Sequence, residues 1–165
     1  MKAFYNLKIA TKLMVAFAAV IVLTIFVGVF SILQLSKVND LSTDIATNWM
    51  PSTRSLLEMK ASMARFRQQE VQYTTAINPD DVAYYEKGMN EGWARWTRNR
   101  AEYEKLISSP DEKALYLDYA KNMDLYEGEH KKVAAAVKSQ REGADVLMRG
   151  ESQRVYREMM GLIDK

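Results

Sequence analysis

Cysteine is absent from the sequence, which excludes a disulfide scaffold, a thiolate metal site and a cysteine nucleophile. Proline and glycine are scarce, with three and seven copies in 165 residues. Alternating polar and apolar stretches bounded by turn residues, the signature of strands, are also missing. Met, Ala, Leu, Glu, Lys and Arg are abundant, and this balance favours long helices. We therefore expect an all-α fold.

Motifs of catalysis are missing as well. The sequence has no glycine-rich phosphate loop, no H-E-x-x-H motif and no recognisable pairing of a nucleophile with a base. It has no C-x-x-C-H motif, which excludes covalently attached haem. The net charge is only +2 and the lysines and arginines form no basic stripe, whereas nucleic-acid binding needs clustered cations. We expect no enzyme, no cofactor or metal and no nucleic-acid partner.

One long apolar run is present, from Leu13 to Leu33, and its 21 residues carry no charge. A helix of about 20 apolar residues crosses the hydrocarbon core of a bilayer, which is about 30 Å thick. The apolar part of a signal peptide is shorter, about 7–15 residues, and precedes a small-x-small cleavage site. The sequence SILQLSKVND that follows offers no such site. The run predicts an uncleaved transmembrane helix over residues 13–35.

The charges on either side of the span indicate its orientation. Three lysines precede it, and two aspartates with a single lysine follow it closely: Lys2, Lys8, Lys12, Asp40, Asp44 and Lys37. Because positive residues stay on the cytoplasmic side, we expect residues 1–12 in the cytoplasm. Residues 36–165 then form a domain outside the inner membrane.

Beyond the span, apolar residues recur every three or four positions in four stretches, which we place at about 36–77, 80–107, 110–140 and from 144 onward. The pairs Asn78-Pro79 and Ser109-Pro110 end one helix and begin the next, and Gly143 opens the third connection. Pro51 is expected to kink or break the first helix. Short connections between such helices predict an antiparallel up-down-up-down four-helix bundle anchored in a membrane.

The expected helix lengths are unequal. At 1.5 Å per residue the first helix is about 60 Å long and the fourth about 33 Å. In such a bundle the last helix returns to the membrane beside the first helix, so it would need to be about as long as the first. We therefore expect the fourth helix to be truncated, with a second transmembrane helix and the signalling domains lying beyond it.

Several segments resemble methyl-accepting chemotaxis proteins. NLKIATKLMVAF, at residues 6–17, leads into the apolar run and resembles the start of these receptors. The stretches NWMPSTR, LLE and RFRQQE, at residues 48–54, 56–58 and 65–70, are similar to the first helix of their four-helix-bundle sensor. YEKLISSPDE, at residues 103–112, resembles the turn between its second and third helices. The resemblance covers essentially the whole chain.

The resemblance implies a homodimeric receptor in the bacterial inner membrane, with its sensor in the periplasm. It further implies a second span, a HAMP linker and a cytoplasmic hairpin that controls the chemotaxis histidine kinase and its adaptor. Relatives that bind amino acids hold the ligand carboxylate with arginines spread along the first helix. This sequence has Arg65 and Arg67 but no further arginine in the following turns, which argues against aspartate or serine as the ligand. Di- and tricarboxylic acids remain open.

Candidate ligand-binding residues combine arginines, which suit a carboxylate, with polar groups beside the expected inner face of the bundle. They are Arg65, Arg67, Gln69, Tyr73, Thr74, Arg98, Tyr119 and Tyr126. For each, an ordinary role as a surface charge or a packed tyrosine is the alternative interpretation. Together they predict a receptor for a small, anionic solute such as an organic acid or amino acid.

Two further residues draw attention by their positions on apolar stripes. Glu70 lies on the stripe of the first helix, and we expect it to pair with an arginine of a neighbouring helix because a buried carboxylate needs a partner. His130 is the only histidine, and we expect it to be packed and hydrogen-bonded rather than a metal or haem ligand. Two alternatives to a chemoreceptor stay open: the same sensor on a histidine kinase or cyclic-dinucleotide enzyme, and a membrane-anchored structural bundle without a ligand.

Overall fold

A computed structural model describes residues 8–139 and 143–164. These residues form helices and no strand. In chain order the elements are α2 (Ile9–Asp44), the π-helical segment η1 (Ile45–Trp49), α3 (Met50–Tyr73), α4 (Pro79–Glu104), α5 (Pro110–Lys138), α6 (Ala144–Arg149) and α7 (Glu151–Ile163). The all-helical expectation is confirmed. Contacts divide the chain into two compact units, Met1–Thr47 and Asn48–Lys165, each described by itself below.

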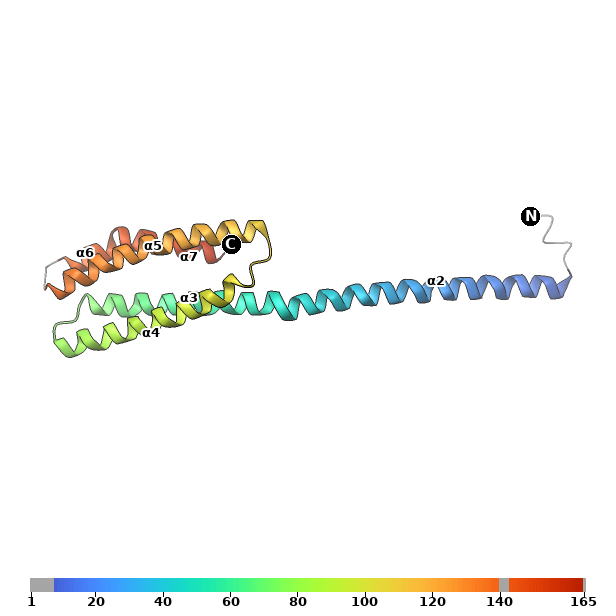
Figure 1. Ribbon diagram of the computed structural model, residues 1–165, viewed down its shortest axis with the longest axis horizontal. Helices are drawn as coiled ribbons and strands as arrows, with labels where there is room; N and C mark the ends of the chain where they lie inside the picture. Colours follow the sequence, from blue (N-terminus) through green and yellow to red (C-terminus); the bar gives the residue numbers. More distant parts are fainter. Residues whose placement is uncertain (1–7, 140–142, 165) are drawn as a thin grey trace. The chain divides into compact units, whose positions relative to one another are not determined.

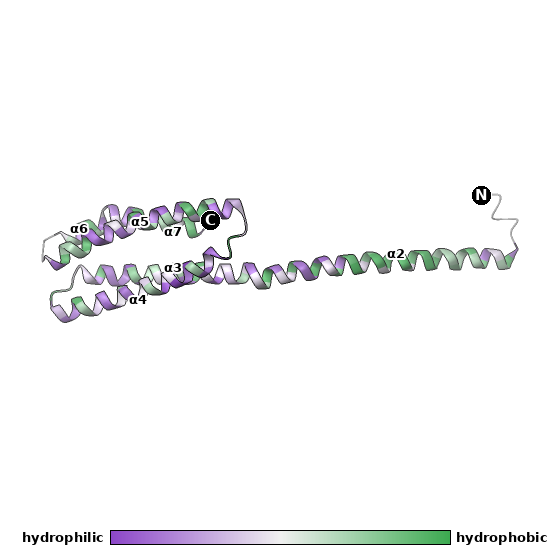
Figure 2. Cartoon of the chain, in the orientation of Figure 1, coloured by the Kyte–Doolittle hydropathy of each residue, from purple (hydrophilic) through white to green (hydrophobic). Residues whose placement is uncertain are grey.

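The first unit contains α2, a helix with no buried residue. In Figure 2 hydrophobic residues follow one another along much of α2, whereas hydrophobic and hydrophilic residues alternate along the later helices. By length and composition, the helical stretch that includes α2 is the one candidate among the described residues for crossing a membrane. The apolar side chains of Val38, Leu41 and Ile45 are exposed, so this part of the predicted first-helix stripe covers no core.

The segment η1 ends at Trp49, two residues before Pro51, where the sequence predicts a kink or break. Proline has no N–H to donate to the preceding turn, and its ring clashes with the carbonyl four residues earlier. A π-helical turn is wider than an α-helical one and accommodates such an interruption. The local irregularity at residues 45–49 is the structural form of the predicted break.

The second unit is a four-helix bundle in which α3 packs beside α4, and α5 beside α6 and α7 (Figure 1). Side-chain caps define two helix starts. Asn78 accepts a hydrogen bond from the Asp81 amide at the start of α4, and Ser109 accepts one from the Glu112 amide at the start of α5. The sequence predicts the cap at Ser109, and at Asn78 it predicts the boundary between two helices. In both caps the side-chain oxygen pairs with an amide that has no partner within the helix.

The predicted end of the first helix is wrong by four residues. The helix α3 ends at Tyr73, not at residue 77, and Ile77 is 97% exposed instead of lying on the core stripe. Thr74 and Thr75 donate their hydroxyl hydrogens to the carbonyls of Val71 and Gln72, at 2.8 and 2.9 Å. Threonine hydroxyls compete in this way for backbone partners and favour helix ends. The helices predicted to end at 107 and 140 end at Glu104 and Lys138.

The fourth helix is not continuous as predicted but is divided into α6 and α7 at Gly150. Gly150 has φ −85° and ψ −122°, which lies outside the helical region. Glycine has little preference for the helix because it retains backbone freedom in the unfolded chain. The break at Gly150 was not predicted, because apolar residues recur with helical spacing on both sides of it.

The core is rich in methionine and aromatic side chains. Its fully buried members include Met59, Met63, Tyr73, Tyr126 and Met159. Flexible methionines fill irregular gaps between larger rings, as in many helix interfaces. Such a core leaves few places for a charged group.

Between α3 and α4 the backbones come close at Gly92. A Cβ atom there would lie 3.4 Å from the Ser62 carbonyl oxygen and 3.5 Å from the Phe66 Cβ. The small residue thus sets the separation of the first helix pair.

Candidate functional site

A buried polar cluster interrupts the apolar core. Its centre is the ion pair of Arg67 and Glu70, one turn apart on α3, whose side chains are only 8% and 0% exposed. The guanidinium Nη1 donates to Glu70 Oε2 at 3.0 Å. The sequence predicted an arginine partner for Glu70 on a neighbouring helix, and this was wrong. The partner is on the same helix because residues three apart lie on one face.

Arg67 also reaches across the bundle to the fourth helix. Nη1 donates to Ser152 Oγ at 2.6 Å, and Nη2 donates to the Met148 carbonyl and to Gln153 Oε1, both at 2.8 Å. The guanidinium carbon lies 5.3 Å from the ring centre of Tyr156. A buried guanidinium needs such partners for its fixed fork of donors. Both Nη groups of Arg67 are thus bonded within the protein.

Glu70 is held by α5 as well. Tyr126 donates its hydroxyl hydrogen to Oε2 at 2.6 Å, and His130 Nδ1 lies 2.8 Å from Oε1. Burial alone would raise the pKa of the Glu70 carboxyl, but the hydrogen bonds from His130 and Tyr126 and the positive charges nearby outweigh it and lower that pKa. The burial of Tyr126 itself, together with the charge of Glu70, raises the pKa of the Tyr126 hydroxyl. Glu70 therefore remains a carboxylate at neutral pH.

His130 packs as the sequence predicted. Its ring lies 4.9 Å from that of Phe66 in an edge-on arrangement, and its Nδ1 bonds to Glu70. A second carboxylate, Glu86 of α4, accepts a hydrogen bond from Tyr73 and pairs with Lys138 at 3.0 Å. Charged and phenolic groups from α3, α4 and α5 therefore meet in this part of the bundle.

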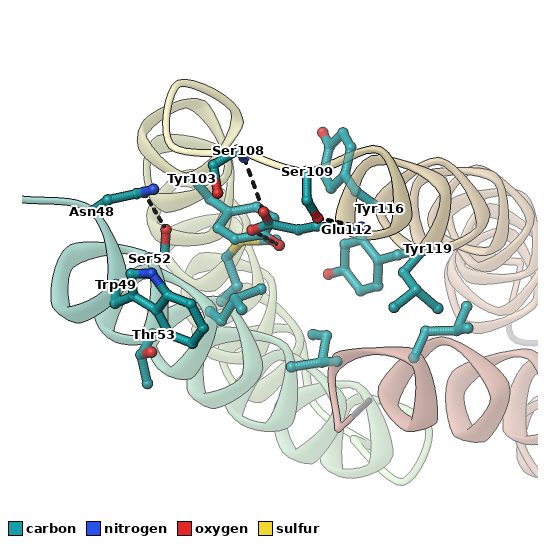
Figure 3. A pocket seen from close by; sticks show the side chains of 15 residues that line it. Asn48, Trp49, Ser52, Thr53, Tyr103, Ser108, Ser109, Glu112, Tyr116 and Tyr119 are labelled. Atoms are coloured by element: carbon teal, nitrogen blue, oxygen red, sulfur yellow. Dashed lines mark hydrogen bonds between the residues drawn. The ribbon is translucent and has the colours of Figure 1, made fainter. Parts of the chain in front are cut away.

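A cavity of about 440 Å³ lies elsewhere in the bundle, between the start of α3, the α4–α5 turn and the last turn of α7. Figure 3 shows Trp49 and Ser52 on the α3 side, with Glu112, Tyr116 and Tyr119 on the α5 side. Its volume is in the range of small-molecule sites. No lysine or arginine is among its described lining residues, and Glu112 is, so the cavity is poorly suited to an anion.

Glu112 in this cavity already has structural partners. Its Oε1 accepts from the Tyr103 hydroxyl at 3.0 Å, and its Oε2 accepts from the Ser108 amide at 3.0 Å. With the Ser109 cap this is close to a capping box, which stabilises the start of α5.

The structure does not bring the eight predicted site residues together. Arg65 and Arg98 are exposed on α3 and α4, and neither has an ion-pair partner among the described residues. Only Tyr119 lines the cavity, and its hydroxyl accepts from Trp96 Nε1 at 2.7 Å. The others lie in the polar cluster, beside it or at the end of α3: Arg67, Tyr126, Tyr73, Gln69 and Thr74.

Sequence reasoning missed the members of the cluster that lie on the fourth helix. Ser152 is fully buried and Gln153 half-buried, yet neither was among the predicted site residues, because both lie inside the helix expected from residue 144 onward. A serine on the same stripe as Val155 and Met159 was the available signal, because a buried hydroxyl requires a partner.

Comparison with protein families gives one decisive result. Residues 6–165 match the family described as a four-helix bundle sensory module for signal transduction, the module of methyl-accepting chemotaxis proteins. The chain belongs to this family. Neither the curated proteins nor the solved structures give a match. The resemblance seen in the sequence is thereby confirmed, and the polar cluster and the cavity lie within a sensory module.

The buried ion pair predicts a pH-dependent contribution to the stability of the sensory module. A depressed pKa means that Glu70 stabilises the fold above its unfolded pKa, near 4.5, and that this contribution disappears as the pH falls through the lower folded value. Glu70→Gln should cost about 3 kcal/mol at pH 7, because it leaves the buried guanidinium unpaired.

Urea unfolding followed by circular dichroism, at pH 7 and at progressively lower pH, measures this difference. The difference in the free energy of unfolding between the wild-type chain and Glu70→Gln should decrease as the pH is lowered. If this difference stays constant between neutral and strongly acidic pH, the charge of Glu70 contributes nothing to the stability of the fold.

Proposed function

We propose that this chain is the sensor region of a chemoreceptor, anchored by the apolar helix at residues 13–35 and exposing its bundle to the periplasm. In this proposal the bundle detects a small solute and transmits the signal across the inner membrane. The observation that carries the proposal is the family match over residues 6–165, since that module serves signal transduction. The apolar stretch of α2 supports it by supplying a helix long enough to span a bilayer.

The charge of the solute is a separate part of the proposal. An anionic ligand was expected from Arg65, Arg67 and Arg98, but the Nη groups of Arg67 bind Glu70 and the fourth helix. The anion hypothesis therefore rests on Arg65 and Arg98, whose guanidinium groups are exposed. Each can bind a carboxylate in a bidentate manner without first breaking an internal ion pair.

The expected homodimer stays a prediction. In its favour, α3 exposes large apolar side chains on its outer face, among them Met50 and Leu57, which are 65% and 61% exposed. They are spaced by seven residues, the repeat with which a helix meets a second copy of itself in a coiled coil. Exposed apolar patches of this kind mark interaction surfaces.

The absence of cysteine makes the proposed topology directly testable. Single cysteines are introduced at two exposed positions, Lys8→Cys before the span and Ser139→Cys after α5. In intact cells, a membrane-impermeant maleimide with access to the periplasm should label Ser139→Cys and not Lys8→Cys. Lysed cells should give labelling at both. Labelling of Lys8→Cys alone would invert the proposed orientation, and equal labelling in intact cells would refute the anchor.

Direct sensing of an acid is tested by thermal unfolding of the purified chain with amino acids, dicarboxylates and tricarboxylates. A ligand that binds only the folded bundle raises Tm by mass action. We expect one acid to raise Tm by several degrees, and Arg65→Ala or Arg98→Ala to abolish the shift. Arg157→Ala, an exposed arginine on α7, is the matched control and should retain it. If the rise in Tm persists in both Arg65→Ala and Arg98→Ala, the anion hypothesis is contradicted. It is also contradicted if no compound raises the Tm of the wild-type chain.

A further inference from the structure

The break in the fourth helix and the buried arginine are parts of one arrangement. At Gly150 the backbone bonds of α6 end, with the Gly150 amide donating to the Val146 carbonyl at 3.0 Å. New bonds begin with the amides of Gln153 and Arg154, which donate to the Gly150 carbonyl at 3.1 and 3.3 Å. Helix breaks leave backbone groups that need other partners.

Arg67 supplies a partner at this break. In an uninterrupted helix the Met148 carbonyl would accept from the Ser152 amide, four residues on. Here it accepts from Arg67 Nη2 at 2.8 Å. The same guanidinium binds the side chains of Ser152 and Gln153 in the first turn of α7. One side chain of α3 thus bonds to both sides of the break.

The guanidinium is itself fixed in place. Glu70 holds it from the same helix, and Glu70 is held in turn by Tyr126 and His130 of α5. A charge this deeply buried cannot exchange its partners for water without a large cost. This one group therefore ties both sides of the break to α3 and α5, in addition to the Lys60–Asp164 ion pair at the far end of α7 and the packing of Tyr156 on Tyr126.

We propose that Gly150 is a joint in the fourth helix, and that Arg67 is the latch that fixes α7 relative to α6. With the latch closed, the two segments hold the position seen here. With Arg67 withdrawn, α7 can shift along α3 while α6 keeps its place, because few backbone bonds cross the break. Joints of this type absorb motion at a few residues between rigid segments. The proposal concerns the bundle alone and does not depend on a receptor function.

Hydrogen–deuterium exchange of the 165-residue chain in detergent micelles tests the latch. Arg67→Met should accelerate amide exchange in residues 148–154 at least about tenfold, because charged hydrogen bonds that hold the joint are lost. Exchange in α4 should change far less. The matched control is Arg65→Met, an exposed arginine of the same helix, which should leave residues 148–154 unchanged.

A second variant covers the case in which Arg67→Met fails to fold. Ser152→Ala combined with Gln153→Met removes the bonds to α7 and preserves the Arg67–Glu70 ion pair. It should loosen the same segment. The proposal is overturned if exchange at residues 148–154 does not change in either variant that folds. It is equally overturned if exchange in α4 rises by the same factor, since that indicates general loss of stability.

Discussion

A guanidinium and a carboxylate buried side by side determine much of how this bundle is organised. Neither Arg67 nor Glu70 can be left unpaired away from water, so every donor and acceptor near them is drawn into one network. The network takes residues from α3, from α5 and from both segments of the fourth helix. Apolar packing of methionines and aromatic rings is tolerant of sliding, whereas directional bonds to a buried charge are not. The cluster therefore fixes how the helices align along their axes.

This arrangement has a consequence for sensing. An arginine within an internal ion pair does not offer an open site to a carboxylate ligand, even though its residue type suggests one. The exposed arginines Arg65 and Arg98 remain candidates, and the cavity beside Glu112 has neither a lysine nor an arginine in its described lining. In the proposed receptor, the residues that recognise a solute are therefore not the ones that hold the bundle together.

Structural features that depend only on residues close together in the sequence were predictable. The caps at Asn78 and Ser109 depend on bonds three residues away, and the apolar run of α2 depends only on composition. The end of α3 was misjudged because the periodicity at Ile77 continued past the point where threonine hydroxyls end the helix. The break at Gly150 was missed for a similar reason, since apolar spacing is the same on both sides.

The pairing within the core was less accessible to sequence reasoning. Glu70 was recognised as a buried carboxylate in need of a partner, and His130 as a packed histidine. The Arg67–Glu70 pair follows from their spacing of three residues on one helix, but the binding of Ser152 and Gln153 to the same guanidinium depended on how the helices align in space. Helical periodicity specifies which face of a helix is buried, but not how that helix is aligned along its axis with the helix it packs against.

The most direct test of the central claim is a double-mutant cycle of Arg67→Met and Glu70→Gln, measured by urea unfolding at pH 7. If the pair organises the cluster, each single variant leaves a buried group without its partner, and the double variant costs less than the sum of the two. We expect a coupling energy of about 2 kcal/mol or more, as found for groups that share one buried network. Additive effects of the two substitutions would show that Arg67 and Glu70 stabilise the bundle independently, and would contradict this account.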